Sequence, residues 1–389
     1  MPLRFLTAGE SHGPALTGIL EGLPSGLEVS VAALAPEMQR RKRGFGRGAR
    51  QQIETDEVQI VGGVRLGRTL GSPLALWLHN RDWPAWQDTM RVEPPADDAP
   101  PPDRQVRVPR PGHADRVGAV KYAHDDMRNV LERSSARETA MRVALGSVAR
   151  LFLRALDVHI GSRIVAIGPV ADEQPLDCPA RELNGKSDAS PVRCLHAAAE
   201  GDMVAAITEA KRRGDTLGGV FEVVADNLPI GLGSYAQWDR RLEADIGRAL
   251  LSLNAIKGVE VGQGFAAARA HGSAMHDSLE VDGGAFGYAT NRAGGLEGGM
   301  TTGQPLWVRG AMKPLATLMQ ALPSVDVQAR TAAKAHTERS DVCAAPSAAV
   351  VAESLLALVL ADAVLTKFGG DSMQELSDRL NAWRAQCRD

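Results

Sequence analysis

Several sequence features that would indicate a particular class of protein are scarce or missing in this 389-residue chain. Only four cysteines occur, Cys178, Cys194, Cys343 and Cys387, and none forms a Cys-x-x-Cys pair. The spacing suggests neither a zinc site nor a disulfide framework. Because the N-terminus also lacks the charged and then apolar pattern of a secretory signal, we expect a cytoplasmic protein.

The chain has neither a large excess of charge of one sign nor many long apolar runs. A net charge of −3 argues against a dedicated nucleic-acid binder, which is usually basic. The longest apolar run, residues 348–365, contains Glu353 and Asp362, so we expect a buried helix rather than a membrane span. Aromatic residues make up only 4% of the chain, whereas 40 glycines and 22 prolines predict many turns in a globular protein.

The most informative stretch is residues 132–146. Ser135 and Glu138 have the spacing of a capping box, and the apolar residues that follow recur at helical spacing. Arginines in a first helical turn oppose the helix dipole, so Arg137 and its neighbours favour an anion bound there. An ordinary capped helix with solvated arginines is the alternative.

The densest positive charge lies in residues 40–50, where five arginines and one lysine are interspersed with glycines. Interleaved glycines allow backbone and guanidinium groups to close on a small phosphate or carboxylate, which we favour for a near-neutral protein. A nucleic-acid patch and a solvated charge run remain as alternatives.

Two histidines lie in tight turns. His12 stands between Ser11 and Gly13, and His113 follows Pro-Gly and precedes Asp115 by two positions. A histidine fixed in this way can act as an acid or a base. The competing interpretations are a surface histidine at His12 and a satisfied turn histidine at His113.

The remaining pattern indicates an alternation of strands and helices. We expect strands at residues 3–6, 16–23, 58–64, 73–78, 158–167, 220–225, 258–264 and 308–313, and helices at 35–43, 195–213, 240–255 and 346–368. The loops near 40–50, 93–108 and 290–303 are expected to be mobile. The glycine-rich 290–303 lacks the spacing of a dinucleotide site and of a P-loop. A Gly-x-Thr-Leu-Gly turn at 67–71 and at 214–218 hints at an internal duplication.

Three segments, in this order, together resemble the signatures of the chorismate synthase family: residues 9–24, 134–137 with the helix that follows, and 339–353. Residues 44–47, 109–113, 291–299 and 312–314 resemble the same family, so the likeness spans nearly the whole chain. The resemblance implies one α+β domain over residues 1–389, a β-α-β sandwich with long helices between two antiparallel sheets. It also implies a homotetramer.

The implied activity is that of a carbon–oxygen lyase at the last common step of the shikimate pathway. It makes chorismate from 5-enolpyruvylshikimate 3-phosphate by a 1,4-trans elimination of phosphate with loss of a C6 hydrogen. The family requires reduced FMN without net redox change, and NADPH would serve only as a source of reductant. A metal, a nucleic acid and a membrane are not expected as partners. The alternatives are a flavin- or nucleotide-binding protein without lyase activity and an RNA-binding role for residues 40–50.

The resemblance also assigns residues. His12 would protonate the departing phosphate, His113 would protonate or stabilise the reduced flavin ring, and Asp341 would assist proton removal. Family descriptions place a nicotinamide nucleotide at Arg41 and Arg47, where we expect the substrate instead. The substrate would be bound by Ser11, Arg41, Arg47, Arg50, Arg110 and Arg137. The flavin would be contacted by Arg133, Ser134, Ser135, Asn254, Ala255, Gly298, Lys313, Pro314, Leu315, Ala316, Thr317 and Arg339.

Overall fold

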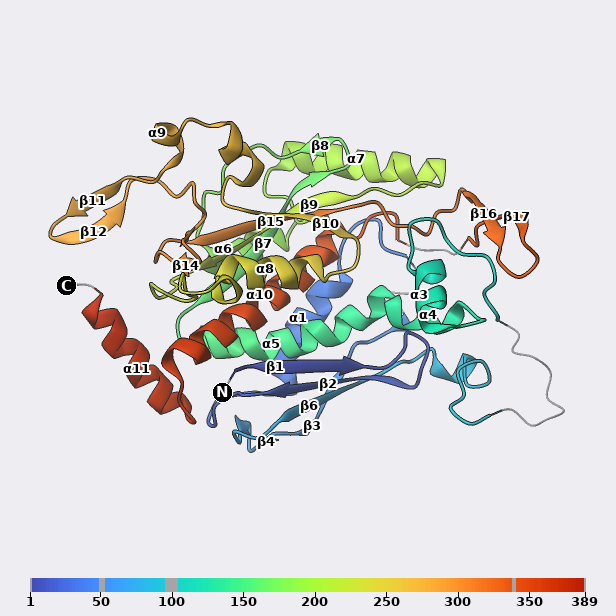
Figure 1. Ribbon diagram of the computed structural model, residues 1–389, viewed down its shortest axis with the longest axis horizontal. Helices are drawn as coiled ribbons and strands as arrows, with labels where there is room; N and C mark the ends of the chain where they lie inside the picture. Colours follow the sequence, from blue (N-terminus) through green and yellow to red (C-terminus); the bar gives the residue numbers. More distant parts are fainter. Residues whose placement is uncertain (1, 49–52, 95–103, 338–340, 388–389) are drawn as a thin grey trace.

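Two antiparallel sheets enclose a layer of long helices in the computed structural model, which describes residues 2–48, 53–94, 104–337 and 341–387 (Figure 1). The first sheet has the order β1-β2-β6-β3, with β1 (Arg4–Ala8), β2 (Ala15–Glu21), β6 (Leu74–His79) and β3 (Val58–Gly62). The second has the order β10-β15-β9-β7-β8, with β10 (Ile256–Val261), β15 (Leu306–Met312), β9 (Gly219–Asp226), β7 (His159–Ile167) and β8 (Val170–Ala171).

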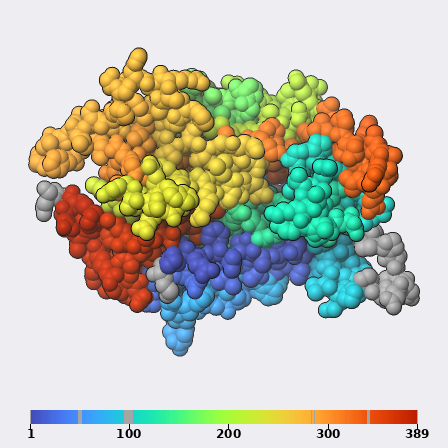
Figure 2. Space-filling model, viewed as in Figure 1, coloured from blue at the N-terminus to red at the C-terminus, as the bar shows by residue number. Residues whose placement is uncertain are grey.

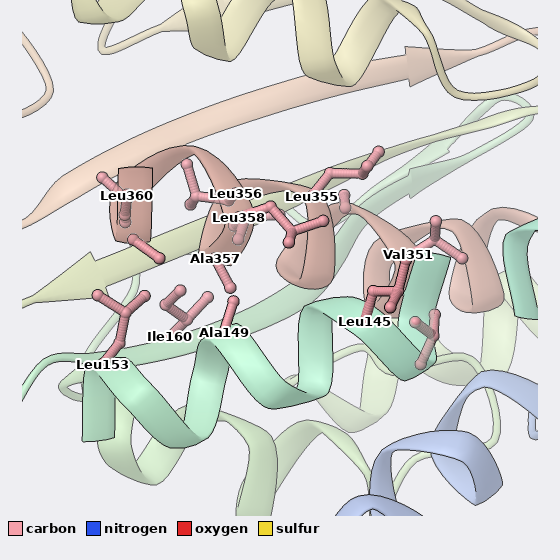
Figure 3. Close-up of a cluster of buried hydrophobic side chains, with 14 of the residues drawn as sticks. Leu145, Ala149, Leu153, Ile160, Val351, Leu355, Leu356, Ala357, Leu358 and Leu360 are labelled. Carbon is pink, nitrogen blue, oxygen red and sulfur yellow. The ribbon is translucent and has the colours of Figure 1, made fainter. Parts of the chain in front are cut away.

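The helical layer consists of α1 (Val31–Lys42), α5 (Thr139–Ala155), α8 (Leu242–Leu251) and α10 (Ala345–Phe368). The side chains of α5, among them Leu145 and Ala149, are directed at α10 (Figure 3). The two helices approach closely at Gly146, where an added Cβ would lie 2.4 Å from the Cβ of Ser354. The main core therefore extends from this layer to the buried side chains of both sheets.

Helix α10 is long and apolar enough to cross a membrane by length and composition alone. It lies instead between the sheets, and 83% of its most apolar window is buried. This confirms the buried helix expected from the apolar run. Its C-terminus is capped by Gly369, whose N–H donates to the carbonyl of Leu365.

The two sheets differ in how they are covered. In β2 the buried Leu16, Gly18 and Leu20 alternate with exposed Thr17 and Ile19, so one face of the first sheet packs on the helices and the other faces outward. Strand β7 is buried along nearly its whole length, because α10 contacts the second sheet while α6 (Ala180–Ser187) and α7 (Ala197–Arg213) also pack against it.

Shorter elements surround the two sheets in the described part of the chain. They are β4 (Val64–Arg65), β5 (Arg68–Thr69), η1 (Trp83–Ala85), α3 (Asp115–Tyr122), α4 (Arg128–Ser134), η2 (Ala136–Glu138), η3 (Trp238–Arg240), η4 (Gly264–Arg269), α9 (Gly272–Met275), β11 (Leu279–Asp282), β12 (Ala285–Tyr288), β13 (Leu296–Glu297), β14 (Met300–Thr301), β16 (Pro323–Asp326), β17 (Thr331–Lys334) and α11 (Met373–Gln386).

The predicted strands and long helices are all present, with ends that differ by a few residues. Helix α1 begins before residue 35, because Ser30 is its N-cap and accepts a bond from the Ala33 N–H. Residues 290–303 contain the β13–β14 hairpin rather than loop alone. Parts of the other two expected loops, 49–52 and 95–103, lie outside the described residues. The mobility of all three and the internal duplication stay predictions.

The predicted capping box at Ser135 is wrong. Ser135 instead caps the short helix η2 through a bond from the Arg137 N–H, and α5 begins only at Thr139. The Glu138 carboxylate accepts bonds from Thr7 and Arg142 rather than bonding back to the Ser135 N–H. The junction of α4, η2 and α5 is therefore a break between helices, and its residues, among them Ser135 and Arg137, line a cavity.

Candidate active site

A cavity of about 440 Å³ opens at the end of the helical layer where α4 meets α5. In the space-filling view, residues of α3 and α4 adjoin the β16–β17 hairpin at this end of the molecule (Figure 2). Bonds from Ser324 to the Pro109 carbonyl and from the Val327 N–H to the Arg107 carbonyl join the hairpin region to the chain that precedes α3. Sequence-distant segments are thus brought around one cavity.

Most of the residues assigned by resemblance line this cavity. They are Ser11, His12, Arg41, Arg47, Arg110, His113, Ser134, Ser135, Arg137, Asn254, Ala255, Lys313, Leu315, Ala316, Thr317 and Asp341. Arg50 and Arg339 lie outside the described residues. Arg133 and Pro314 are adjacent in sequence to lining residues but are not part of the wall themselves. The Arg133 guanidinium donates to the carbonyls of Thr7 and Gly9 and so supports the turn that carries His12.

Gly298 is separate from the cavity within one chain. It occupies the turn between β13 and β14, where the Leu242 N–H donates to the carbonyl of Gly299. The hairpin therefore lies at the N-terminal end of α8, whereas Asn254 and Ala255 line the cavity beyond the other end of that helix. Ten helical residues rise about 15 Å, so this chain's own Gly298 is distant from the cavity wall.

His12 is fixed by a buried carboxylate that the sequence did not reveal. Its Nδ1 lies 2.8 and 2.9 Å from the two carboxylate oxygens of Glu132, and its backbone N–H donates to the same group at 2.9 Å. Trp86 stacks on the imidazole with ring centroids 3.7 Å apart, and Nε2 lies 4.0 Å from Asp82 Oδ2. With Nδ1–H bonded to Glu132, Nε2 is the nitrogen that gains or loses the exchangeable proton.

The charge on Glu132 is maintained by its neighbours. Burial alone would raise the pKa of Glu132, but the hydrogen bonds and charge of His12 and a bond from Arg128 lower it below its usual range. The Glu132 side chain is fully buried, and Arg128 Nη1 lies 2.9 Å from it. The carboxylate is therefore ionised and able to stabilise a protonated His12.

His113 is bound in a comparable manner by Asp115, the first residue of α3. Its Nδ1 lies 2.6 Å from Asp115 Oδ1, and Arg110 Nε donates to the other carboxylate oxygen at 2.9 Å. Burial would raise the pKa of Asp115, yet the bonds from His113 and Arg110 hold it well below its usual range. Lys313 Nζ donates to the Gly112 carbonyl at 2.8 Å, which joins this turn to the end of β15.

The arginines of the cavity are held by acidic residues. Arg137 contacts Asp56, donates to Glu54 Oε2 at 3.2 Å and to Asn80 at 2.9 Å. Arg41 donates to the Asp56 carboxylate at 3.2 Å and to the Ala136 carbonyl at 3.0 Å. Asp56 adopts a left-handed φ of 56°, which is costly for a residue other than glycine. Two guanidinium groups are thereby fixed before any ligand binds.

The effect of burying these arginines close together is seen in the pKa of Arg41. Burial lowers the pKa of Arg41 to about 10, and the nearby charges of Arg47 and Arg137 act in the same direction, opposed by Asp56. Such a concentration of buried positive charge favours an anionic ligand. Arg41 and Arg40 are both buried, so the basic segment 40–48 is not an exposed nucleic-acid patch.

Asp341 and Arg47 are paired with each other. Arg47 Nη1 lies 2.6 Å from Asp341 Oδ2, and the Gly48 N–H donates to the other oxygen at 2.6 Å. A further bond from the Val342 N–H to the Gly46 carbonyl fastens the two segments together. An anion that binds Arg47 competes with Asp341 for the same guanidinium group.

The cavity lining also suits a flat ring that carries an anionic group. Leu131, Leu253, Met312, Leu315 and Val351 supply apolar surface, and Lys313 supplies a cation. Asn254 Nδ2 donates to the Ser134 carbonyl, and the Lys313 N–H donates to that of Ala255. These residues fit a flavin mononucleotide. Among the described residues, no cluster of three or more His, Cys, Asp or Glu side chains is arranged to hold a metal ion.

An α+β fold whose cation-rich cavity also holds two carboxylate-bound histidines defines an enzyme for acid–base chemistry on a small anionic substrate. A model of the family described as chorismate synthase matches residues 3–365. Chorismate synthase of Thermobifida fusca is 53% identical over 385 residues, which cover 98% of each chain. That of Chlorobaculum tepidum is 48% identical over 396 residues, which cover 99% of this chain and 98% of the relative. The chain belongs to the chorismate synthase family.

A solved crystal structure of chorismate synthase matches this fold with a TM-score of 0.80 at 39% identity, covering 100% of this chain and 99% of the other. The resemblance inferred from the sequence is thereby confirmed, together with the α+β class of the fold. The activity is that of the family, a lyase of the final step of the shikimate pathway toward aromatic amino acids.

Proposed function

We propose that the cavity binds 5-enolpyruvylshikimate 3-phosphate beside reduced FMN, and that His12, His113 and Asp341 carry the proton chemistry of chorismate formation. The convergence of Arg41, Arg47, Arg110 and Arg137 on one cavity supports this most directly. The substrate carries a phosphate and two carboxylates, and guanidinium groups bind such anions through paired charge-assisted hydrogen bonds.

Each proton carrier has a distinct task in this proposal. His12 donates the proton on Nε2 to the oxygen of the departing phosphate, and Glu132 stabilises the imidazolium until then. Asp341 accepts the proton lost from C6 once the anionic substrate has engaged Arg47. His113, which lines the cavity together with Lys313 and Thr317, would protonate or stabilise the reduced flavin ring. When bound, reduced FMN would supply transient electron donation, and no net redox change would result.

The flavin would be held by Ser134, Ser135, Asn254, Ala255 and the segment from Lys313 to Thr317, with Lys313 opposite its negative charge. NADPH enters the proposal only as a reductant for free flavin. A cytoplasmic location is also proposed, and the four cysteines, which form no disulfide, are compatible with a reducing compartment.

A homotetramer is proposed as the functional assembly. Hairpin β11–β12 projects from the body of the chain (Figure 1) and exposes Leu279, Val281 and Phe286 by 66–79%. An isolated two-stranded hairpin is marginally stable, so another copy is expected to cover it. If Gly298 contacts flavin, as the resemblance implies, it would do so from a neighbouring copy. Light scattering is expected to give the mass of four chains, and the mass of one chain would contradict the assembly.

Replacement of Arg47 by alanine is expected to weaken substrate binding about 10- to 100-fold, because hydrogen bonds to charged groups contribute about 1.5–3 kcal/mol. Calorimetric titration with the substrate, in the presence of oxidised FMN so that no turnover occurs, measures the change in Kd. Arg43→Ala is the matched control, since Arg43 precedes the same loop but is exposed. An unchanged Kd for Arg47→Ala would place the anion elsewhere.

A further inference from the structure

The two carboxylate oxygens of Glu54 differ in their surroundings, as far as the described residues show. Its Oε2 accepts bonds from the Arg81 N–H at 3.1 Å and from Arg137 Nη2 at 3.2 Å. Its Oε1 is buried, and no donor within the described part of the chain bonds to it. The side chain is only 5% exposed, and the residue lines the active-site cavity.

A buried carboxylate oxygen without a donor is costly, so its retention points to a ligand that supplies one. The guanidinium groups of Arg41 and Arg137, which line the same cavity, can only donate hydrogen bonds. They suit acceptors, and the phosphate and both carboxylates of the substrate are acceptors. Ionised 5-enolpyruvylshikimate 3-phosphate has a single hydrogen-bond donor, the hydroxyl on C4.

We propose that Glu54 Oε1 accepts a hydrogen bond from the C4 hydroxyl of the substrate and so determines the orientation of the ring. The inference rests on the substrate position proposed above. C4 lies between C3, which carries the phosphate, and C5, which carries the enolpyruvyl carboxylate. The other oxygen of the same carboxylate holds Arg137. In this proposal, one oxygen of Glu54 binds the C4 hydroxyl and the other holds the Arg137 guanidinium group next to an anionic substituent of the substrate.

Glu54 would otherwise serve only to neutralise Arg137. The two roles make different predictions for a substrate analogue that lacks the C4 hydroxyl. If Glu54 only neutralises Arg137, its removal changes the binding of the anionic groups, which the substrate and its 4-deoxy analogue share, so the affinity for both ligands changes equally. If Glu54 accepts a hydrogen bond from the C4 hydroxyl, its removal weakens binding of the natural substrate alone.

The test is a double cycle of two ligands and two proteins. Calorimetry with oxidised FMN present measures Kd for 5-enolpyruvylshikimate 3-phosphate and for its 4-deoxy analogue, each on wild type and on Glu54→Ala. We expect wild type to bind the deoxy analogue about 10- to 100-fold more weakly, and the variant to bind the two ligands within about threefold of each other. Undiminished discrimination in Glu54→Ala would overturn the proposal.

Two further variants make the outcome decisive. Glu54→Gln keeps the size of the side chain but removes its charge. A neutral hydrogen bond is roughly half as strong as a charge-assisted one, so the ratio of the two Kd values should fall to about the square root of the wild-type ratio. Glu57→Ala removes a carboxylate three positions along that is 74% exposed, and should retain the full discrimination. If wild type binds neither ligand, the proposed substrate site fails and the role of Glu54 fails with it.

Discussion

Replacement of His12 by alanine is expected to lower kcat by about 10²- to 10⁴-fold, the range for loss of a general acid or base. The side chain lies in the cavity wall, stacked on Trp86 and bonded to Glu132, rather than in the apolar core. Its removal should therefore leave the fold intact. Anaerobic steady-state kinetics with reduced FMN measure the change, and circular dichroism verifies the fold.

A matched control for this variant is available at His159. That residue also pairs with a carboxylate, with Nε2 3.0 Å from Asp157 Oδ1, but it begins β7 and does not line the cavity. His159→Ala should keep the wild-type kcat. Glu132→Gln retains His12 but removes the charge behind it, and should produce a smaller loss than His12→Ala. A wild-type rate in His12→Ala would show that His12 is not the proton donor.

Replacement of Glu353 by alanine is expected to destabilise the protein by about 3–5 kcal/mol, because three buried arginines would lose their common counter-charge. Glu353 is completely buried in α10 and contacts Arg40, Arg150 and Arg193. Ser162 and Asn184 donate to it as well. The network joins α1, α5 and the second sheet to α10, so its loss affects the whole helical layer.

The same network predicts a dependence of stability on pH. Burial would raise the pKa of Glu353, but the charges of Arg40 and Arg150 outweigh it and hold the pKa far below the usual carboxyl range. Since the folded pKa is depressed, the stabilisation is complete above the ordinary carboxyl pKa and is lost as the pH falls from there through the folded value. Denaturant midpoints of wild type and Glu353→Ala should therefore converge in acid.

Glu182→Ala is the control for this experiment. Glu182 is half exposed on α6, and its contact with Arg181 is long, at 3.8 Å. Its effect should stay within about 0.5 kcal/mol, as for ordinary surface substitutions. Equal denaturation midpoints for wild type and Glu353→Ala at neutral pH would show that the buried network contributes little stability.

Periodicity predicted the core well because it reports burial directly. The alternation along β2 and the continuous apolar run of α10 both correspond to the faces that are buried. Capping signals were less reliable. The serine–glutamate spacing failed at Ser135, where the chain makes η2 first, yet the same spacing at Ser372 and Glu375 caps α11, which the sequence analysis did not predict.

The missed hairpin β11–β12 had a recognisable signal. Two glycines separate short segments with alternating apolar residues, which is typical of a hairpin, but its exposed side chains give no intramolecular core to identify. The missed partners in the site had no such signal. Glu132 meets His12 across 120 positions, and Glu54 meets Arg137 across 83. Contacts of this kind depend on the packing of the helical layer rather than on local sequence.

The measurement that tests the central claim most directly is an anaerobic assay of the purified protein with dithionite-reduced FMN and 5-enolpyruvylshikimate 3-phosphate. Chorismate absorbance and phosphate release are followed together. The account predicts that both appear in equal amounts, only with reduced flavin, and that His12→Ala nearly abolishes both. Substrate and flavin binding without either product, or product formation with oxidised FMN alone, would contradict it.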